Sequence, residues 1–269
     1  MSKLLKTINS SLVKKFVMAI TGFVLVSFLF IHMLGNLQTF EGGPHAINAY
    51  AKFLQTLPWE ILWGFRGVMA LCIVLHFLMG YLLVLENKKA RPQKYAVQKF
   101  VTASLAARTM IYSGTVIIIF VVFHLMHFTI LNLDPVFSKL EWISDKGVEY
   151  HDVYAMMIYG FSNTLVSVGY IVALAIMCYH LSHAVSSMFQ SLGLRNEQTR
   201  KYLGWIAIAY SVVIFLGFST NPAAVLASKY TPCKAFPVDS VVKQINEQQT
   251  AGAEKIYVKY ACETCEAHK

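Results

Sequence analysis

Long apolar stretches separated by short polar ones occupy most of this chain. Five of them approach the ~20 residues that an α-helix needs to cross a bilayer, at about residues 16–37, 61–85, 110–131, 163–189 and 202–218. The first is too long for the core of a signal peptide and lacks a small-residue cleavage site, so we expect it to be retained. The pattern predicts an all-α membrane protein, with five transmembrane helices in residues 1–219 and a polar C-terminal tail over residues 220–269.

The composition excludes an ordinary water-soluble domain. Hydrophobic residues make up 56% of the chain and charged residues 14%, against about 25% charged in a typical soluble domain. The mean hydropathy is +0.52. The net charge of +9 would suit a nucleic-acid-binding protein. However, the basic residues are confined to short stretches beside the predicted spans, which indicates membrane topology and no nucleic-acid partner.

Lysine and arginine orient the predicted helices, because cytoplasmic loops carry an excess of both. They precede the first span and fill the second and fourth loops: Lys3, Lys6, Lys14, Lys15, Lys88, Lys89, Arg91, Lys94, Lys99, Arg108, Arg195, Arg200 and Lys201. The first and third loops are acidic: Glu41, Glu60, Asp134, Glu141, Asp145, Glu149 and Asp152. We therefore expect a cytoplasmic N-terminus and, after five spans, a C-terminal tail on the opposite side.

Histidines are the informative residues, since an ionisable group at membrane depth is unfavourable and usually functional. Each of the first four spans carries at least one, and the fifth carries none. In chain order they are His32, His76, His124, His127, His180 and His183. Packing alone does not readily explain four consecutive spans with this residue.

The depths of four histidines define two layers. His32 and His124 each lie 16 residues from the cytoplasmic ends of their spans, or about 24 Å along a helix. His76 and His180 each lie 9 residues from those ends, or about 14 Å. Two pairs about 10 Å apart along the membrane normal predict two bis-histidine b-type haems stacked in a bundle formed by the first four spans.

Other readings of the histidines fit less well. Zinc needs about four converging ligands, whereas each layer offers two and no intramembrane carboxylate. The dihaem cytochrome b of quinol:cytochrome c reductases places paired histidines far apart on one helix, whereas same-helix pairs here are three residues apart. A haem-free transporter or assembly anchor with a histidine relay is the alternative from another functional class.

Two histidines have a less definite role. His127 and His183 each follow another histidine by three residues and so share its helix face. The layer depths favour His124 and His180 as ligands. We place His127 and His183 around the ligands, where they would bond a haem propionate, water or a quinone, and surface-facing interfacial histidines are the equal alternative.

The sequence resembles the b558-type dihaem cytochrome b membrane anchors of succinate dehydrogenases and fumarate reductases. The resemblance covers about residues 10–218. It rests on the order and spacing of FLFIHMLGNLQTFEGGPHAINAYAKFLQTLP (28–58), LHFLMGYLLVL (75–85), SGTVIIIFVVFHLMHF (113–128) and YHLSHAVSSMFQSLG (179–193). The resemblance implies that His32 and His124 bind a distal haem, and that His76 and His180 bind a proximal haem.

The resemblance also implies partners, because the chain has no flavin- or nucleotide-binding motif and no ferredoxin-type cysteine run. An iron–sulfur subunit would dock on the basic cytoplasmic loops and carry a flavoprotein that interconverts succinate and fumarate. This chain would pass electrons between the iron–sulfur subunit and a membrane quinone, expected to be menaquinone. The expected location is the bacterial cytoplasmic membrane, and complexes of this kind can associate further.

Polar residues after the first span are candidates for the quinone site. Glu41 is placed to exchange a proton and His45 to hydrogen-bond a quinone carbonyl, with Asn36 and Gln38 nearby. The alternative is an ordinary polar loop with a Gly-Gly-Pro turn at residues 42–44.

Arginines at span ends have two readings. Arg66 and Arg108 are candidates to pair with haem propionates, although topology and snorkelling also place arginines there.

One departure from the family concerns proton movement. Some fumarate reductases carry a transmembrane proton-conducting glutamate two residues before the haem ligand of the fourth span, where this chain has Cys178.

The tail carries a short cysteine motif, Cys262-Glu-Thr-Cys265. A c-type haem would require a histidine directly after the second cysteine, and residue 266 is Glu. We expect a disulfide on an oxidising outer face, with a partial metal site including His268 as the alternative.

Overall fold

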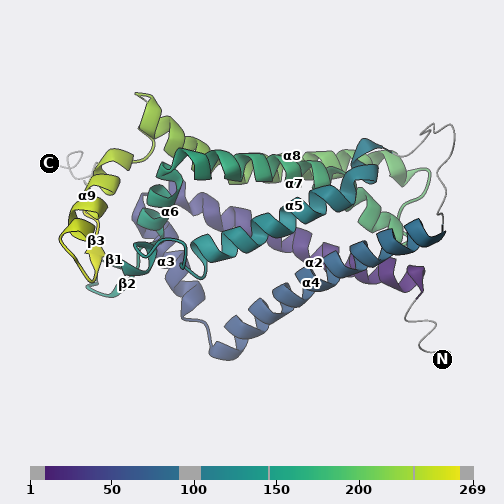
Figure 1. Ribbon diagram of the computed structural model, residues 1–269, viewed down its shortest axis with the longest axis horizontal. Helices are drawn as coiled ribbons and strands as arrows, with labels where there is room; N and C mark the ends of the chain where they lie inside the picture. Colours follow the sequence, from purple (N-terminus) through teal and green to yellow (C-terminus); the bar gives the residue numbers. More distant parts are fainter. Residues whose placement is uncertain (1–9, 91–103, 145, 233, 261–269) are drawn as a thin grey trace. The chain divides into compact units, whose positions relative to one another are not determined.

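A computed structural model describes residues 10–90, 104–144, 146–232 and 234–260. It is 78% helical. Five helices are long and apolar enough to cross a membrane (Figure 1). They are α2 (Ser11–Leu37), α4 (Trp59–Ala90), α5 (Leu105–Phe128), α7 (Thr164–Ser191) and α8 (Thr199–Tyr230). The predicted all-α fold with five membrane-length helices is confirmed, and the chain is a multi-pass membrane protein.

Helix α8 continues well beyond the predicted end at residue 218. It spans 32 residues and contains Pro222, which cannot donate a backbone hydrogen bond. Asn221 is 4% exposed, and its Nδ2 donates to the Asn36 carbonyl at 3.1 Å. Thr39 Oγ1 donates to Asn221 Oδ1 at 2.7 Å. The apolar run ends where these polar contacts begin, so hydropathy placed the helix end too early.

The chain divides into two compact units. The first comprises residues 1–33, 58–121 and 173–217, and the second comprises residues 34–57, 122–172 and 218–269. Several expected features lie outside the described residues, namely Lys3, Lys6, Arg91, Lys94, Lys99, Asp145, Cys233, Cys262, Cys265 and His268.

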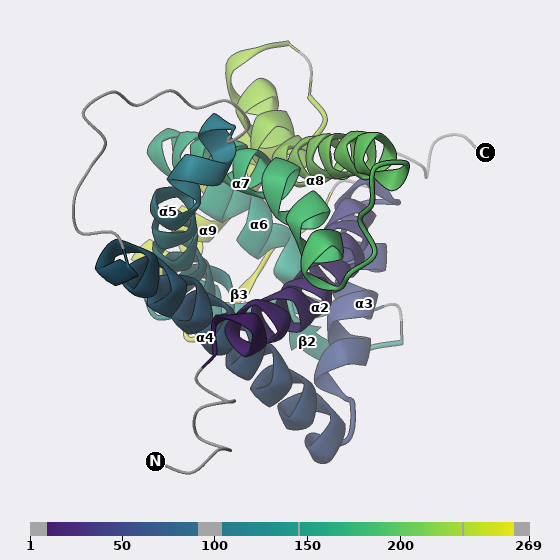
Figure 2. The same cartoon turned by 90° about the vertical axis from the view of Figure 1, so that its right-hand side faces the viewer.

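The first unit contains portions of all five long helices. Figure 2 shows the beginning of α2 beside α4. There the largely buried Lys14 of α2 forms an ion pair with Glu86 of α4. Tyr210 Oη of α8 donates to the Val26 carbonyl of α2 at 2.6 Å. Polar contacts between helices therefore supplement the packing of apolar faces.

The second unit adds short elements that the apolar pattern did not predict. The segment between α2 and α4 forms η1 (Gln38–Phe40) and α3 (Pro44–Gln55). The segment between α5 and α7 forms η2 (Phe137–Lys139), β1 (Leu140–Ile143), β2 (Glu149–His151) and α6 (Val153–Ser162), and the tail forms α9 (Val238–Thr250) and β3 (Ile256–Tyr257).

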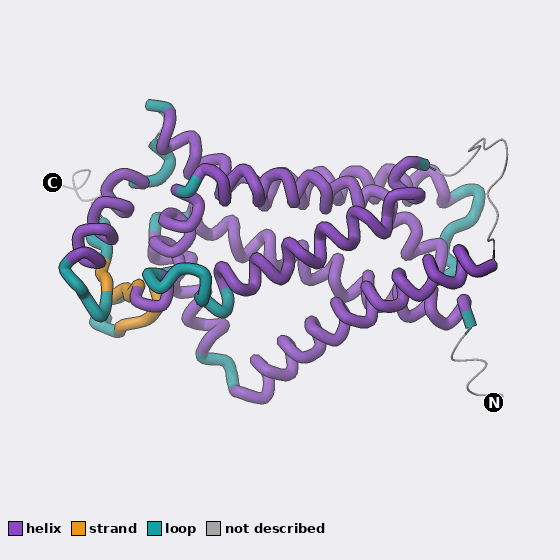
Figure 3. The backbone as a smooth tube through the Cα atoms, in the orientation of Figure 1, coloured by secondary structure: helices purple, strands orange, loops and turns teal. Residues whose placement is uncertain are grey.

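A three-stranded sheet joins the tail to the segment between α5 and α7. β1 pairs antiparallel with β2 and parallel with β3, and Figure 3 shows the strands together near α9. Leu140, Ile158, Ile245 and Ile256 are fully buried in this unit. The tail is therefore folded through residue 260 and is not a simple polar extension.

Asp152 of the second unit has no exposed surface. It caps α6, because Oδ1 accepts from the Ala155 amide at 2.9 Å, and it also accepts from Asn48 Nδ2 at 3.0 Å. Oδ2 accepts from Tyr260 Oη at 2.7 Å. Burial raises the pKa of Asp152 despite these hydrogen bonds. One side chain thus links α3, α6 and the tail.

Candidate functional site

The intramembrane histidines divide between the two units. His32, His76, His180 and His183 belong to the first, and His124 and His127 belong to the second. The members of the predicted proximal pair, His76 and His180, therefore share a unit. The members of the predicted distal pair have their surroundings in different units.

His76 of α4 is held by α2. Its Nδ1 lies 3.0 Å from the Met18 carbonyl and 3.4 Å from Thr21 Oγ1. Thr21 Oγ1 donates to the Val17 carbonyl at 2.8 Å, so it presents a lone pair to the imidazole. Both neighbours act as acceptors, which places the proton on Nδ1. Gly22 permits this approach, since a Cβ there would lie 3.2 Å from His76 Cε1.

His180 of α7 is held in the same way by α5. Its Nδ1 lies 2.9 Å from Ser113 Oγ. Ser113 Oγ donates within its own helix, to the Met110 carbonyl at 3.1 Å, and its lone pairs can then accept from His180 Nδ1. A Cβ at Gly114 would lie 3.5 Å from His180 Cε1. A glycine and a hydroxyl on the neighbouring helix thus accompany each histidine of this pair.

These contacts leave Nε2 of both rings available to bind a metal. Neither Nε2 has a hydrogen-bond partner among the described residues, and neither is fully enclosed. A neutral imidazole protonated on Nδ1 carries its lone pair on Nε2, the atom that binds a metal. Each imidazole of the pair can therefore bind a metal through Nε2.

His183 lies three residues beyond His180 and is half-buried. Arg195 Nη1 donates to Gln190 Oε1 at 2.7 Å, while its Nε is buried without a hydrogen-bond partner in the described part of the chain. An anionic group with acceptor oxygens would satisfy this donor. The sequence predicted only a role in membrane topology for Arg195, and not this buried, unpartnered donor.

His32 is half-buried and stacks on Phe28, with the ring centroids 5.2 Å apart and the planes 13° apart. Arg66 is exposed, and its guanidinium lies 5.1 Å from the centroid of the Trp63 ring. Arg108 is exposed in the first turn of α5. The two arginines proposed as propionate partners are therefore on exposed surfaces of the first unit.

His124 and His127 of α5 both face Tyr170 of α7. Tyr170 Oη lies 3.0 Å from His127 Nδ1 and 3.4 Å from His124 Nδ1. His127 is 6% exposed and Tyr170 is 5% exposed. Tyr170 is not among the residues predicted from the sequence, where the available signal was a side chain with a polar tip inside an apolar run.

The polar candidates after α2 do not form one cluster. Glu41 is exposed, and its amide donates to the Gln38 carbonyl at 3.1 Å, which closes η1. His45 is exposed in the first turn of α3. Its ring packs edge-on against Trp142, with the ring centroids 5.2 Å apart. The Asn36 carbonyl instead accepts from Thr39 Oγ1 at 2.7 Å and from Asn221.

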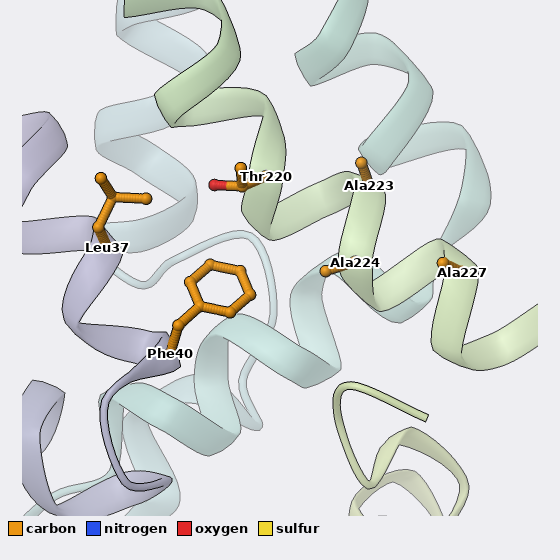
Figure 4. Close-up of a pocket in the computed structure, with 6 residues that line it drawn as sticks. All are labelled: Leu37, Phe40, Thr220, Ala223, Ala224 and Ala227. Carbon is orange, nitrogen blue, oxygen red and sulfur yellow. The ribbon is translucent and has the colours of Figure 1, made fainter. Parts of the chain in front are cut away.

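An apolar groove of about 450 Å³ lies next to these residues in the second unit. Figure 4 shows the Phe40 ring beside α8, whose small side chains form the opposite wall. The lining residues are Leu37, Phe40, Thr220, Ala223, Ala224 and Ala227. Thr39 and Asn221, each adjacent in sequence to a lining residue, form a buried polar pair that the sequence analysis did not identify.

Larger clusters of metal-binding side chains do not occur in the part of the chain that the structure describes: no three His, Cys, Asp or Glu residues converge. Cys72 and Cys178 are free cysteines within α4 and α7.

Comparison with protein-family models, curated proteins and solved structures found no match to this chain.

Proposed function

We propose that this chain is the dihaem cytochrome b membrane anchor of a succinate:quinone oxidoreductase, passing electrons between an iron–sulfur subunit and a membrane quinone. The observation that carries the proposal is the matched environment of His76 and His180. Each Nδ1 lies within hydrogen-bond distance of a group on the adjacent helix that can accept its proton, and each Nε2 is left for a ligand. Neighbouring contacts of this kind are typical of imidazoles that bind metals.

His76 and His180 would hold the proximal haem b, and His32 and His124 the distal one. When bound, haem b supplies reversible one-electron chemistry at its iron. The neutral imidazoles add no charge to a low-dielectric site. The hydrogen bonds from Nδ1 orient each ring and raise the basicity of Nε2. The buried Nε of Arg195 is suited to a propionate.

The proposed topology puts the iron–sulfur and flavoprotein partners on the cytoplasmic side. All described lysines and arginines of the N-terminal segment and of the second and fourth loops belong to the first unit: Lys14, Lys15, Lys88, Lys89, Arg108, Arg195, Arg200 and Lys201. Their grouping supports a cytoplasmic face in a bacterial inner membrane. The acidic Asp134, Glu141 and Glu149 belong to the second unit.

The quinone would bind in the second unit. The apolar groove between η1 and α8 suits an isoprenoid chain such as that of menaquinone. Exposed Glu41 is the proposed proton-exchanging group. His45 and Gln38 remain proposed carbonyl partners, while Asn36 is engaged through its backbone carbonyl.

Haem content tests this proposal directly. The purified complex should give a b-type reduced-minus-oxidised spectrum and two haems per chain by pyridine haemochrome. His76→Ala and His180→Ala should each remove one haem, because each removes an axial ligand. His183→Ala is the matched control on α7 and should retain both. A wild-type preparation without haem would overturn the proposal and favour a haem-free protein with a histidine relay.

A further inference from the structure

Tyr170 makes the two histidines of α5 chemically different. Its hydroxyl lies within hydrogen-bond distance of Nδ1 of both His127 and His124, at 3.0 and 3.4 Å. A hydroxyl has one proton to donate and two lone pairs to accept with. The Tyr170 hydroxyl can therefore accept a hydrogen bond from one imidazole while it donates a hydrogen bond to the other. This arrangement puts the two rings in opposite tautomers.

Only one of these tautomers is an iron ligand through Nε2. The histidine that donates its Nδ1–H to Tyr170 has a lone pair on Nε2, like His76 and His180. The histidine that accepts from Tyr170 carries its proton on Nε2 and has no lone pair there. The direction of the two hydrogen bonds around Tyr170 thus decides which histidine of α5 binds.

The packing around the two rings indicates the direction. His127 is enclosed by aromatic rings, with centroid distances of 4.1 Å to Phe128 and 5.2 Å to Phe137. Its exposed fraction is 6%, whereas His124 is half-buried. The more accessible ring belongs to the depth layer of His32. The enclosed ring is suited to a fixed hydrogen-bonding role.

Tyr170 itself is rigidly held. It is 5% exposed and makes edge-on contacts with Phe161 at 5.0 Å and with Phe123 at 5.9 Å. Tyr170 is buried, so losing its hydrogen bonds with the histidines would be unfavourable. Such a site strongly favours the arrangement in which hydrogen-bond donors and acceptors match.

We propose that Tyr170 is the positioning residue that selects His124 as the haem ligand of α5. It accepts from His124 Nδ1 and donates to His127 Nδ1. This inference rests on the proposed function. It goes beyond that function by giving His127 a definite role as the partner of Tyr170, and by making Tyr170 a determinant of the electronic state of one haem.

The test compares Tyr170→Phe with wild type in the intact complex, by haem count, redox titration and EPR of the ferric low-spin haems. Loss of the acceptor for His124 Nδ1–H lowers the basicity of Nε2 and disfavours the ferric state. We expect the midpoint potential of one haem to rise and its low-spin EPR signal to shift, while the other haem is unchanged. Incorporation of 4-aminophenylalanine at position 170 should restore both values toward wild type.

Controls separate this role from general damage. Tyr112→Phe makes the same chemical change on α5 at a side chain that is 72% exposed, and should change neither potential. The proximal haem, held in the other unit, reports folding in every variant. His124→Phe should lose one haem, and His127→Phe should retain two.

Three results would overturn the inference. In a wild-type complex with two haems, unchanged potentials and EPR signals in Tyr170→Phe would remove the role of Tyr170. Loss of a haem in His127→Phe, with both retained in His124→Phe, would reverse the selection. Absence of haem from wild type would overturn this inference and the proposed function together.

Discussion

At the scale of single residues, Ser113 shows how a neighbour can act on a haem ligand without touching the haem. Ser113→Ala would remove the acceptor of His180 Nδ1–H, which lies at 2.9 Å. We expect haem to remain bound but with about 10- to 100-fold lower affinity, the usual effect of losing such a contact. Haem retention during dilution or competition with a haem-binding protein measures the change.

Ser182→Ala supplies the control for Ser113→Ala. Ser182 is half-buried, and its Oγ donates to the Tyr179 carbonyl at 2.7 Å within α7. Its removal should leave haem affinity at the wild-type value. Equal affinities in Ser113→Ala and wild type would show that the hydrogen bond to His180 does not contribute.

Asp152 gives a prediction for the second unit that does not depend on haem. Asp152→Ala removes the cap of α6 and leaves Asn48 and Tyr260 without their acceptor. We expect a loss of about 2–4 kcal/mol in unfolding free energy. Asp152→Asn keeps an acceptor for the helix cap and should lose less. Thermal unfolding of the purified chain, or hydrogen exchange of α6, measures the difference.

The pH dependence of stability follows from the raised pKa of Asp152. In the window between the unfolded and the folded pKa, the folded state binds more protons than the unfolded state, so stability falls as the pH rises through it. Below the window the contribution is fully present. Asp152→Asn should remove this slope in unfolding measured across acidic pH, and an unchanged slope would contradict the assignment to Asp152.

At the scale of elements, glycines set how closely one helix approaches a histidine of the next. A Cβ at position 22 would lie 3.2 Å from His76 Cε1, and the hydrogen bond to the Met18 carbonyl restrains the ring. Gly22→Ala should displace His76 and shift the α-band or potential of one haem. Gly67→Ala, with nothing within 4 Å of the added Cβ, is the matched control and should leave the spectrum unchanged.

The sequence is most informative where one physical effect dominates. Hydropathy identifies all five long helices, because burial in lipid requires an uninterrupted apolar run. Intramembrane histidines stand out because their presence there is unfavourable. The end of α8 was placed too early because Asn221 and Thr39 pair across 182 positions of sequence, which no local pattern reveals.

The contacts of the site depend on neighbours that a linear sequence does not display. Ser113 and Thr21 are ordinary hydroxyl residues until the fold places them against His180 and His76. Tyr170 reaches two histidines that lie more than 40 positions earlier in the chain. Helix periodicity shows that His124 and His127 share a face, but only the opposing helix distinguishes them.

At the scale of the whole molecule, the charge distribution predicts which ends of the helices face the cytoplasm. In a variant lacking the five native cysteines, Gln198→Cys lies in the basic loop between α7 and α8, and Gln249→Cys lies in α9; both positions are exposed. An impermeant maleimide should label position 249 in right-side-out vesicles and position 198 in inverted ones. The reverse pattern would invert the proposed topology.

The parallel pairing of β1 with β3 has a consequence for biogenesis. Two membrane helices, α7 and α8, separate these strands along the chain, so both strands emerge on the same side only after both helices have been inserted. The sheet and the Tyr260–Asp152 contact therefore form after the C-terminal segment has been translocated. A truncated or incompletely exported chain would leave β1 with an unpaired edge, which a quality-control protease can recognise.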